Sequence, residues 1–171
     1  MAGLTNILGR TVYLDANIFI YTVEGYAPEA AFLRELFAAL EDGRFTAVTS
    51  ELSLAEVLVK PFELGHENVA AAYTELLTPS DRLAVLPADR AILVEAARQR
   101  AALGMPMPDA IHVATALAAG CELFLTNDRR LILLRLRRQS RILARLNQHQ
   151  RAALLSGELS WDELSRGEGD G

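Results

Sequence analysis

The sequence predicts an α/β fold, a three-layer sandwich in which a central parallel sheet of four or five strands lies between layers of helices. Four short runs rich in aliphatic, β-branched or aromatic residues alternate with longer segments of helical periodicity. This alternation favours parallel strands joined by right-handed helical crossovers. The chain of 171 residues, 51% of them hydrophobic, is also long enough for one domain with a buried core.

The strands are predicted from their composition and from the residues that stop them. Asp15 stops the first run and Pro87 the third. The four predicted strands are Thr11–Leu14, Thr46–Thr49, Leu83–Leu86 and Leu123–Thr126.

The helices are predicted from apolar periodicity and from their end signals. Pro28 suits a first helical turn, and Gly120 suits the end of the last helix before the fourth strand. The five predicted helices are Pro28–Glu41, Ser53–Val59, Glu67–Leu77, Asp89–Leu103 and Pro108–Ala119.

The segment after Asp128 fits two structures. Leu131–Leu136 has the composition of a fifth strand, but apolar residues from Ile132 to Leu146 also suit one helical face, and we expect a helix. We therefore expect residues 1–131 to form the main domain. Residues 132–171 are expected to be a C-terminal helical extension rich in arginine, followed by an acidic tail, and not an independent domain.

Charge is distributed unevenly along the chain. Residues 1–128 carry 17 acidic and 8 basic residues, whereas residues 129–151 carry eight arginines and no acidic residue. The arginine segment is either a solvated helix face or a site for a polyanion, since phosphate contacts depend on local charge. The single cysteine, Cys121, excludes an internal disulfide framework and a multi-cysteine zinc site. Without an apolar N-terminal run or a membrane span, we expect a cytoplasmic protein with no membrane partner.

Four carboxylates are predicted to converge at one edge of the sheet. In a parallel sheet all carboxyl ends lie at the same edge, where ligands bind. Asp15 follows the first strand and Asp128 the fourth, Glu56 lies early in the helix after the second strand, and Asp109 opens the helix that returns to the fourth strand.

Each of these acids also has a purely structural explanation. Ser53 and Glu56 have capping-box spacing, Asp109 complements a helix dipole, and Asp15 or Asp128 can cap a following helix. Capping does not explain the convergence, because ionised carboxylates repel one another unless a cation lies between them. Ligands that are all oxygen select hard cations such as Mg²⁺ or Mn²⁺.

Four segments together carry a resemblance to a known family. They are YLDANIFIY (Tyr13–Tyr21), TSELSLAEVLVKP (Thr49–Pro61), MPDAIHVATALAAGC (Met107–Cys121) and LFLTND (Leu123–Asp128). In this order and spacing the sequence, from Thr11 to Leu131, resembles PIN-domain ribonucleases, especially VapC-type toxins of toxin–antitoxin pairs. The family usually ends with a short fifth strand soon after its last acidic residue. This sequence differs from that pattern, because an arginine-rich extension and an acidic tail follow Asp128.

The resemblance implies a set of site residues. Asp15, Glu56, Asp109 and Asp128 match the acidic metal-binding and catalytic residues of the family. Asn17, Thr126 and Asn127 match supporting positions near them.

Three further residues have open roles. His112, one turn after Asp109, either contacts substrate or a metal-bound water or merely lines the cleft. Arg129 and Arg130 are placed either to bind flanking RNA phosphates or to pair with surface acids.

The resemblance also implies the activity and partners. It implies an endoribonuclease that uses Mg²⁺ or Mn²⁺ to hydrolyse RNA phosphodiester bonds, leaving 5′-phosphate and 3′-hydroxyl ends. It further implies homodimers and a small antitoxin that inhibits the toxin.

Two other functions remain to be distinguished from a ribonuclease. One is a catalytically inactive PIN-like binding module. The other is an aspartate-based phosphotransfer protein, which normally needs a lysine near the phosphate, whereas Lys60 is the only lysine and is predicted to point away from the strand edge.

Overall fold

The computed structural model describes residues 7–25, 30–126 and 134–135 of the chain. Its elements alternate between strands and helices as the sequence predicts. In chain order they are β1 (Thr11–Leu14), α1 (Ala16–Glu24), α2 (Ala30–Glu41), β2 (Thr46–Ser50), α3 (Glu51–Leu64), α4 (Glu67–Leu76), β3 (Leu83–Leu86), α5 (Arg90–Leu103), α6 (Met107–Ala118), β4 (Leu123–Leu125) and β5 (Leu134–Arg135).

The sheet has the strand order β3-β2-β1-β4-β5, and its first four strands are parallel. Central strand β1 pairs with both β2 and β4, so that Tyr13 lies opposite Val48 on one side and Phe124 on the other. The chain runs outward from β1 to β3 and then returns to place β4 on the other side of β1. The order therefore reverses between β1 and β4, which is where open α/β sheets bind their ligands.

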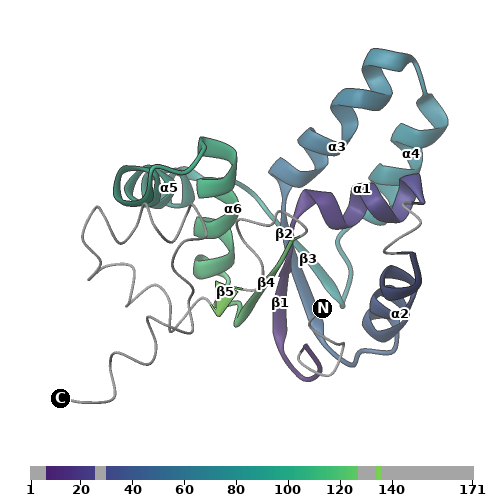
Figure 1. The fold of residues 1–171 in the computed structure, drawn as a ribbon, viewed down its shortest axis with the longest axis horizontal. Helices are drawn as coiled ribbons and strands as arrows, with labels where there is room; N and C mark the ends of the chain where they lie inside the picture. Colours follow the sequence, from purple (N-terminus) through teal and green to yellow (C-terminus); the bar gives the residue numbers. More distant parts are fainter. Residues whose placement is uncertain (1–6, 26–29, 127–133, 136–171) are drawn as a thin grey trace, which may run out of the picture.

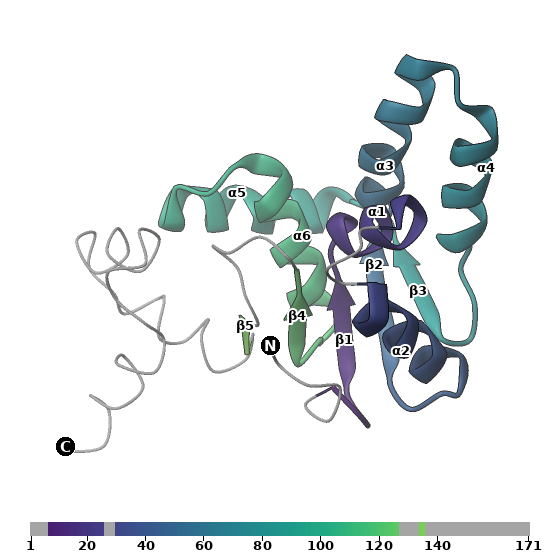
Figure 2. The same ribbon diagram turned by 45° about the vertical axis from the view of Figure 1, so that its right-hand side comes forward.

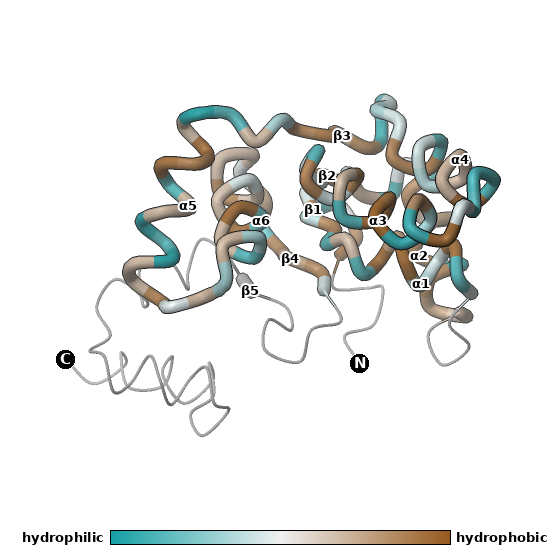
Figure 3. Tube along the Cα trace, turned by 90° about the horizontal axis from the view of Figure 1, so that it is seen from above, coloured by the Kyte–Doolittle hydropathy of each residue, from teal (hydrophilic) through white to brown (hydrophobic). Residues whose placement is uncertain are grey.

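Helices cover both faces of the sheet (Figures 1 and 2). Successive strand residues point to opposite faces, so Val12 and Leu14 join the core beneath α1–α4, while Tyr13 joins the core beneath α5 and α6. Strands β3 and β4 are almost uniformly hydrophobic, whereas α5 alternates hydrophilic and hydrophobic stretches (Figure 3). This pattern confirms the predicted three-layer α/β sandwich. No helix within the described ranges has the length and apolar character needed to cross a bilayer.

Helix α1 has no counterpart among the five predicted helices. Its sequence, ANIFIYTVE, is rich in β-branched and aromatic residues that favour strands. The Asp15 carboxylate caps its first turn by accepting the Ala16 N–H, and Ile18 and Phe19 are buried in the core. Capping and packing therefore outweigh local propensity here.

Helix α3 is longer than predicted and begins differently. Ser50, rather than Ser53, is its N-cap and accepts the Leu52 N–H, so the expected capping box of Ser53 and Glu56 is wrong. The helix also continues through Pro61 to Leu64 instead of ending at Val59. Pro61 is buried, and this packing offsets the hydrogen bond that proline cannot donate.

The segment after Asp128 corrects a second expectation. Leu134–Arg135 pairs antiparallel with β4 as a fifth strand, whereas the sequence led us to expect a helix there. Because β4 would otherwise be an edge strand, its unpaired backbone groups provide the template for β5. The proposed domain boundary at residue 131 and the predicted C-terminal extension beyond Arg135 lie outside the described residues.

Asp89 supplies a direct test of helix capping in this fold. Its Oδ1 accepts the Ile92 N–H at 2.9 Å at the start of α5. We expect Asp89→Ala to lower the free energy of unfolding by about 1 kcal/mol, whereas Asp89→Asn, which keeps the acceptor, should change it by only a few tenths. Urea denaturation measures both, and an equal loss in the two variants would contradict the capping explanation.

Candidate functional site

A pocket of about 240 Å³ opens at the carboxyl edge of the sheet, beside the point where the strand order reverses. Asp15, which follows β1, and side chains from α1, α3, α6 and β4 form its wall. The lining residues are Asp15, Ala16, Asn17, Ile20, Glu56, Asp109, His112 and Phe124. Three of the four carboxylates predicted to converge therefore line the same pocket.

Asp15 is held in one orientation by its neighbours. It is 8% exposed, and its Oδ1 accepts the Ala16 N–H at 2.8 Å. Its Oδ2 accepts the Thr126 hydroxyl at 2.6 Å and the Asn17 amide at 3.4 Å. The carboxylate also lies at the N-terminus of α1, the positive end of the helix dipole.

The pairing of β1 with β4 brings Asp15 and Thr126 together. Leu14 lies opposite Leu125, and the Asp15 N–H donates to the Leu125 carbonyl at 3.0 Å. The next residue on each strand end then faces the other, which explains the short contact between the Thr126 hydroxyl and the Asp15 carboxylate. The positions of Asn17 and Thr126 beside Asp15 agree with the supporting positions predicted from the sequence.

Glu56 reaches the pocket from the second turn of α3. The first turn of this helix is tied to the sheet, because the Thr49 hydroxyl donates to the Leu14 carbonyl and the Ser53 hydroxyl contacts Thr49 at 2.8 Å. The Glu56 side chain is 33% exposed, and its Oε2 lies 2.8 Å from His112 Nε2. Glu56 therefore has one side toward solvent and the other toward α6.

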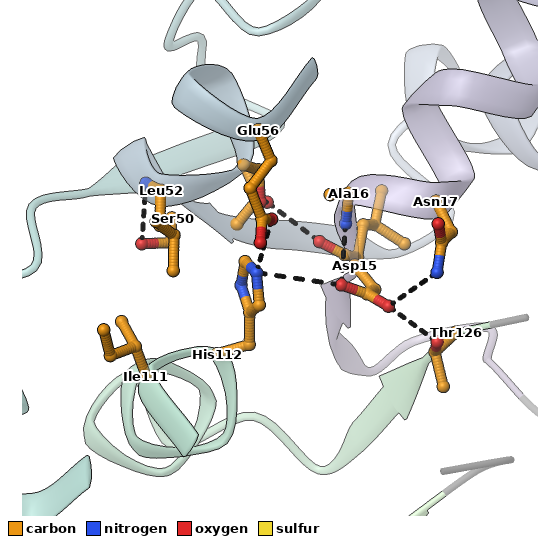
Figure 4. Close-up of polar contacts among 12 residues, drawn as sticks. Asp15, Ala16, Asn17, Ser50, Leu52, Glu56, Ile111, His112 and Thr126 are labelled. Carbon is orange, nitrogen blue, oxygen red and sulfur yellow. Dashed lines mark hydrogen bonds and ion pairs between the residues drawn. The ribbon is translucent and has the colours of Figure 1, made fainter. Parts of the chain in front are cut away.

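His112 lies between the carboxylates from β1 and α3 (Figure 4). Its Nε2 is 2.8 Å from Glu56 Oε2 and 3.9 Å from Asp15 Oδ1, and its Nδ1 is 2.7 Å from the Tyr13 hydroxyl. The imidazole is buried, with 3% of its surface exposed. His112 therefore lines the pocket, as one of the two interpretations from sequence has it, and it also contacts the acidic side chains.

Tyr13 is the residue of this site that sequence reasoning missed. It precedes Asp15 by two residues in the same chain segment, and its ring stacks on Phe124 with centroids 4.9 Å apart. Burial, and after it the negative charge of Asp15, raises the pKa of the Tyr13 phenol above its ordinary value. The signal available in the sequence is a tyrosine inside an otherwise aliphatic strand, next to the first predicted acid.

Asp109 lies in the first turn of α6 and lines the pocket. It is half-buried. The fourth predicted carboxylate, Asp128, lies outside the described residues together with Asn127, Arg129 and Arg130. The geometric account of the site therefore concerns Asp15, Glu56 and Asp109.

The donor set fits a hard divalent cation. Among the described residues no three His, Cys, Asp or Glu side chains form a ready-made metal cluster. Mg²⁺ does not need one, because it commonly binds through one or two carboxylates and keeps several waters. Burial raises the pKa of the Cys121 thiol to about 12, which leaves no thiolate for a softer metal from this residue.

Comparisons with known proteins point to one family. The PIN domain family model matches residues 12–138. Among solved structures, the sarcin–ricin loop cleaving toxin VapC20 of Mycobacterium tuberculosis is similar with a TM-score of 0.57 and 14% identity, over 68% of this chain and 91% of that chain.

Two further structures are similar at comparable levels. The VapBC2 complex of Rickettsia felis, bound to promoter DNA, has a TM-score of 0.54 and 15% identity, over 69% of this chain and 88% of the other. A toxin–antitoxin complex from Klebsiella pneumoniae has a TM-score of 0.53 and 22% identity, over 70% and 88%. No match to a curated protein sequence was found.

Proposed function

Since this chain belongs to the PIN domain family, we propose that it is a metal-dependent endoribonuclease, acting as the toxin of a toxin–antitoxin pair. The observation that carries the proposal is the pocket in which Asp15, Glu56 and Asp109 meet from three separate segments of the chain. A pocket lined by carboxylates at the switch point of a parallel sheet suits Mg²⁺ or Mn²⁺ and, through the metal, a phosphodiester.

Each carboxylate has a proposed role. Asp15, whose orientation its three donors maintain, and Asp109 would be the direct ligands of a first metal ion. Glu56 and Asp128 would complete a second site or hold metal-bound waters. Arg129 and Arg130 are proposed to contact phosphates that flank the cleaved bond, because a pocket of net negative charge does not attract RNA by itself.

The chemistry needs no nucleophilic side chain. When bound, one or two divalent ions supply Lewis acidity and lower the pKa of a coordinated water. In the proposed hydrolysis the oxygen of a water would bond to phosphorus as the bond from phosphorus to the 3′-oxygen breaks, which gives a 5′-phosphate and a 3′-hydroxyl. The protein holds the carboxylates in place, and Asn17 and Thr126 keep Asp15 from rotating away by donating to its Oδ2.

The proposed partners follow from the family. We propose RNA as the substrate, a small antitoxin as the inhibitor and a second copy of the chain as the dimer partner, all in the cytoplasm. Two of the similar structures are themselves toxin–antitoxin complexes, which supports the proposed antitoxin.

Metal removal tests the proposed activity. Purified protein is incubated with mixed RNA in Mg²⁺ or Mn²⁺, with EDTA, and with metal restored after EDTA. We expect cleavage in the metal samples, loss of cleavage in EDTA and recovery on restoring the metal. The carboxylates alone supply no Lewis acid to neutralise the charge on the phosphate oxygens.

A variant controls for contaminating ribonuclease. Asp15→Asn, purified in parallel, should cleave no RNA under the same conditions. Wild-type cleavage that persists in EDTA would contradict the proposal. Metal binding without cleavage of any RNA would instead support a catalytically inactive binding module. A phosphotransfer protein is disfavoured because the residues described as lining the pocket include no lysine.

A further inference from the structure

We propose that Tyr13 and His112 form a relay that positions the Glu56 carboxylate for metal binding, with Tyr13 holding His112 and His112 holding Glu56. The inference rests on the proposed function and deepens it, because it assigns positioning roles to Tyr13 and His112, which the proposed reaction leaves without one. Three elements contribute, since Tyr13 comes from β1, His112 from α6 and Glu56 from α3. Figure 4 shows the His112 side chain beside that of Glu56.

The contacts form a continuous chain from the core to the pocket. The Tyr13 hydroxyl lies 2.7 Å from His112 Nδ1, and His112 Nε2 lies 2.8 Å from Glu56 Oε2. Tyr13 has no exposed surface and His112 is 3% exposed, whereas the Glu56 side chain is 33% exposed. The buried end is therefore rigid, and it fixes the end that solvent would otherwise leave mobile.

The proton positions along the relay follow from the partners. An ionised glutamate only accepts hydrogen bonds, so His112 Nε2 must carry the proton in its contact with Glu56. In the neutral imidazole Nδ1 is then the acceptor, and the Tyr13 hydroxyl donates to it.

Aromatic packing keeps the donor in place. The Tyr13 ring stacks on Phe124 at an interplanar angle of 18°, and the His112 ring meets it edge-on with centroids 5.9 Å apart. Rotation of either ring would disturb a close-packed core, in which misplaced side chains are costly. The relay therefore restricts His112 to one ring orientation.

The same nitrogen lies near both carboxylates. His112 Nε2 is 3.9 Å from Asp15 Oδ1, so one N–H faces the two acids that β1 and α3 bring together. Like charges that line one pocket repel, and a donor close to both offsets part of the repulsion before a cation enters. Hydrogen bonds of this kind orient metal ligands, and their loss typically lowers metal affinity or activity about 10- to 100-fold.

Tyr13→Phe tests the relay with the smallest change, because it removes only the hydroxyl and keeps the aromatic stack. We expect Mn²⁺ affinity, measured by calorimetry with the metal alone, to fall about tenfold, and kcat for RNA cleavage to fall similarly while KM for RNA is unchanged. His112→Leu should show at least the same loss. His112→Gln, which keeps an N–H donor toward Glu56 but loses the link to Tyr13, should show a smaller one.

Tyr73→Phe is the matched control. Tyr73 is another buried tyrosine, 1% exposed, but it belongs to the core on the other face of the sheet and does not line the pocket. Its variant should keep wild-type Mn²⁺ affinity and kcat, even if its thermal stability falls. Thermal melts of all variants separate loss of stability from loss of metal affinity.

A double-mutant cycle with Glu56→Gln identifies the residue through which the relay acts. If the relay acts through Glu56, Tyr13→Phe should cause no further loss of Mn²⁺ affinity in the Glu56→Gln background. Additive losses, or wild-type Mn²⁺ affinity in both Tyr13→Phe and His112→Leu, would overturn the relay while leaving the nuclease proposal intact. A wild-type protein that neither binds Mn²⁺ nor cleaves RNA would refute the proposed function and the relay with it.

Discussion

Asp15→Asn is expected to lower kcat/KM for RNA cleavage by more than about a hundredfold while leaving the protein folded. Loss of a hydrogen bond to a metal ligand typically lowers metal affinity or activity about 10- to 100-fold. Loss of the negative charge of the ligand itself should therefore lower activity by at least about 100-fold. Asp15 is also held in place by three donors to its carboxylate.

The fold should tolerate the asparagine because its side chain has nearly the same shape. Its amide oxygen can accept the Ala16 N–H and cap α1 as the carboxylate does, and asparagine equals aspartate as an N-cap. The Thr126 hydroxyl can rotate to accept from the new amide instead of donating to Oδ2. The variant therefore separates the charge of Asp15 from its capping role.

The measurement compares cleavage rates at saturating Mg²⁺ or Mn²⁺ with urea denaturation of the same samples. Asp89→Asn is the matched control, because it makes the same change at the N-cap of α5, outside the pocket. It should retain wild-type cleavage. Full activity of Asp15→Asn with saturating metal would remove Asp15 from the metal site.

Phe124→Ala is expected to cause the largest loss of stability, about 3–5 kcal/mol in the free energy of unfolding. Phe124 lies in β4 with no exposed surface and stacks on Tyr13 of β1. The truncation leaves a cavity beside Tyr13 in the core that the sheet shares with α5 and α6. Domains are typically stable by only about 5–15 kcal/mol, so this loss is a large share of the total.

Urea denaturation with a matched surface variant measures the effect. Phe62 on α3 is 59% exposed, and Phe62→Ala should change stability by less than about 0.5 kcal/mol. A loss of the same small size for Phe124→Ala would contradict the packing described for β1 and β4. A large loss would show that the strand pair beneath the pocket carries much of the fold's stability.

The strands could be predicted from sequence because each is determined by its own few residues. All four predicted strands are present, and their ends differ from the prediction by one residue at most, as at Ser50 and Thr126. Parallel topology then places Asp15, Glu56 and Asp109 at one edge without any knowledge of side-chain contacts. Their common pocket confirms that placement, while their roles as metal ligands remain predictions.

Helix α1 and strand β5 could not be predicted in the same way. The local sequence of α1 favours a strand, and it becomes a helix because Asp15 caps it and its apolar residues are buried. Strand β5 exists because β4 offers an unpaired edge. Both depend on neighbours that are distant in sequence or on caps that compete with local propensity.

By itself the sequence determined the α/β class, the placement of the acids at the carboxyl edge of a parallel sheet, and the family membership that the family model confirms. Only the tertiary structure decided that His112 lies between Asp15 and Glu56, and that Tyr13 supports it from beneath. The physical reason is the separation along the chain over which each interaction acts. Periodicity and capping act over a few residues, whereas a hydrogen bond between β1, α6 and α3 exists only after packing has set the positions of all three.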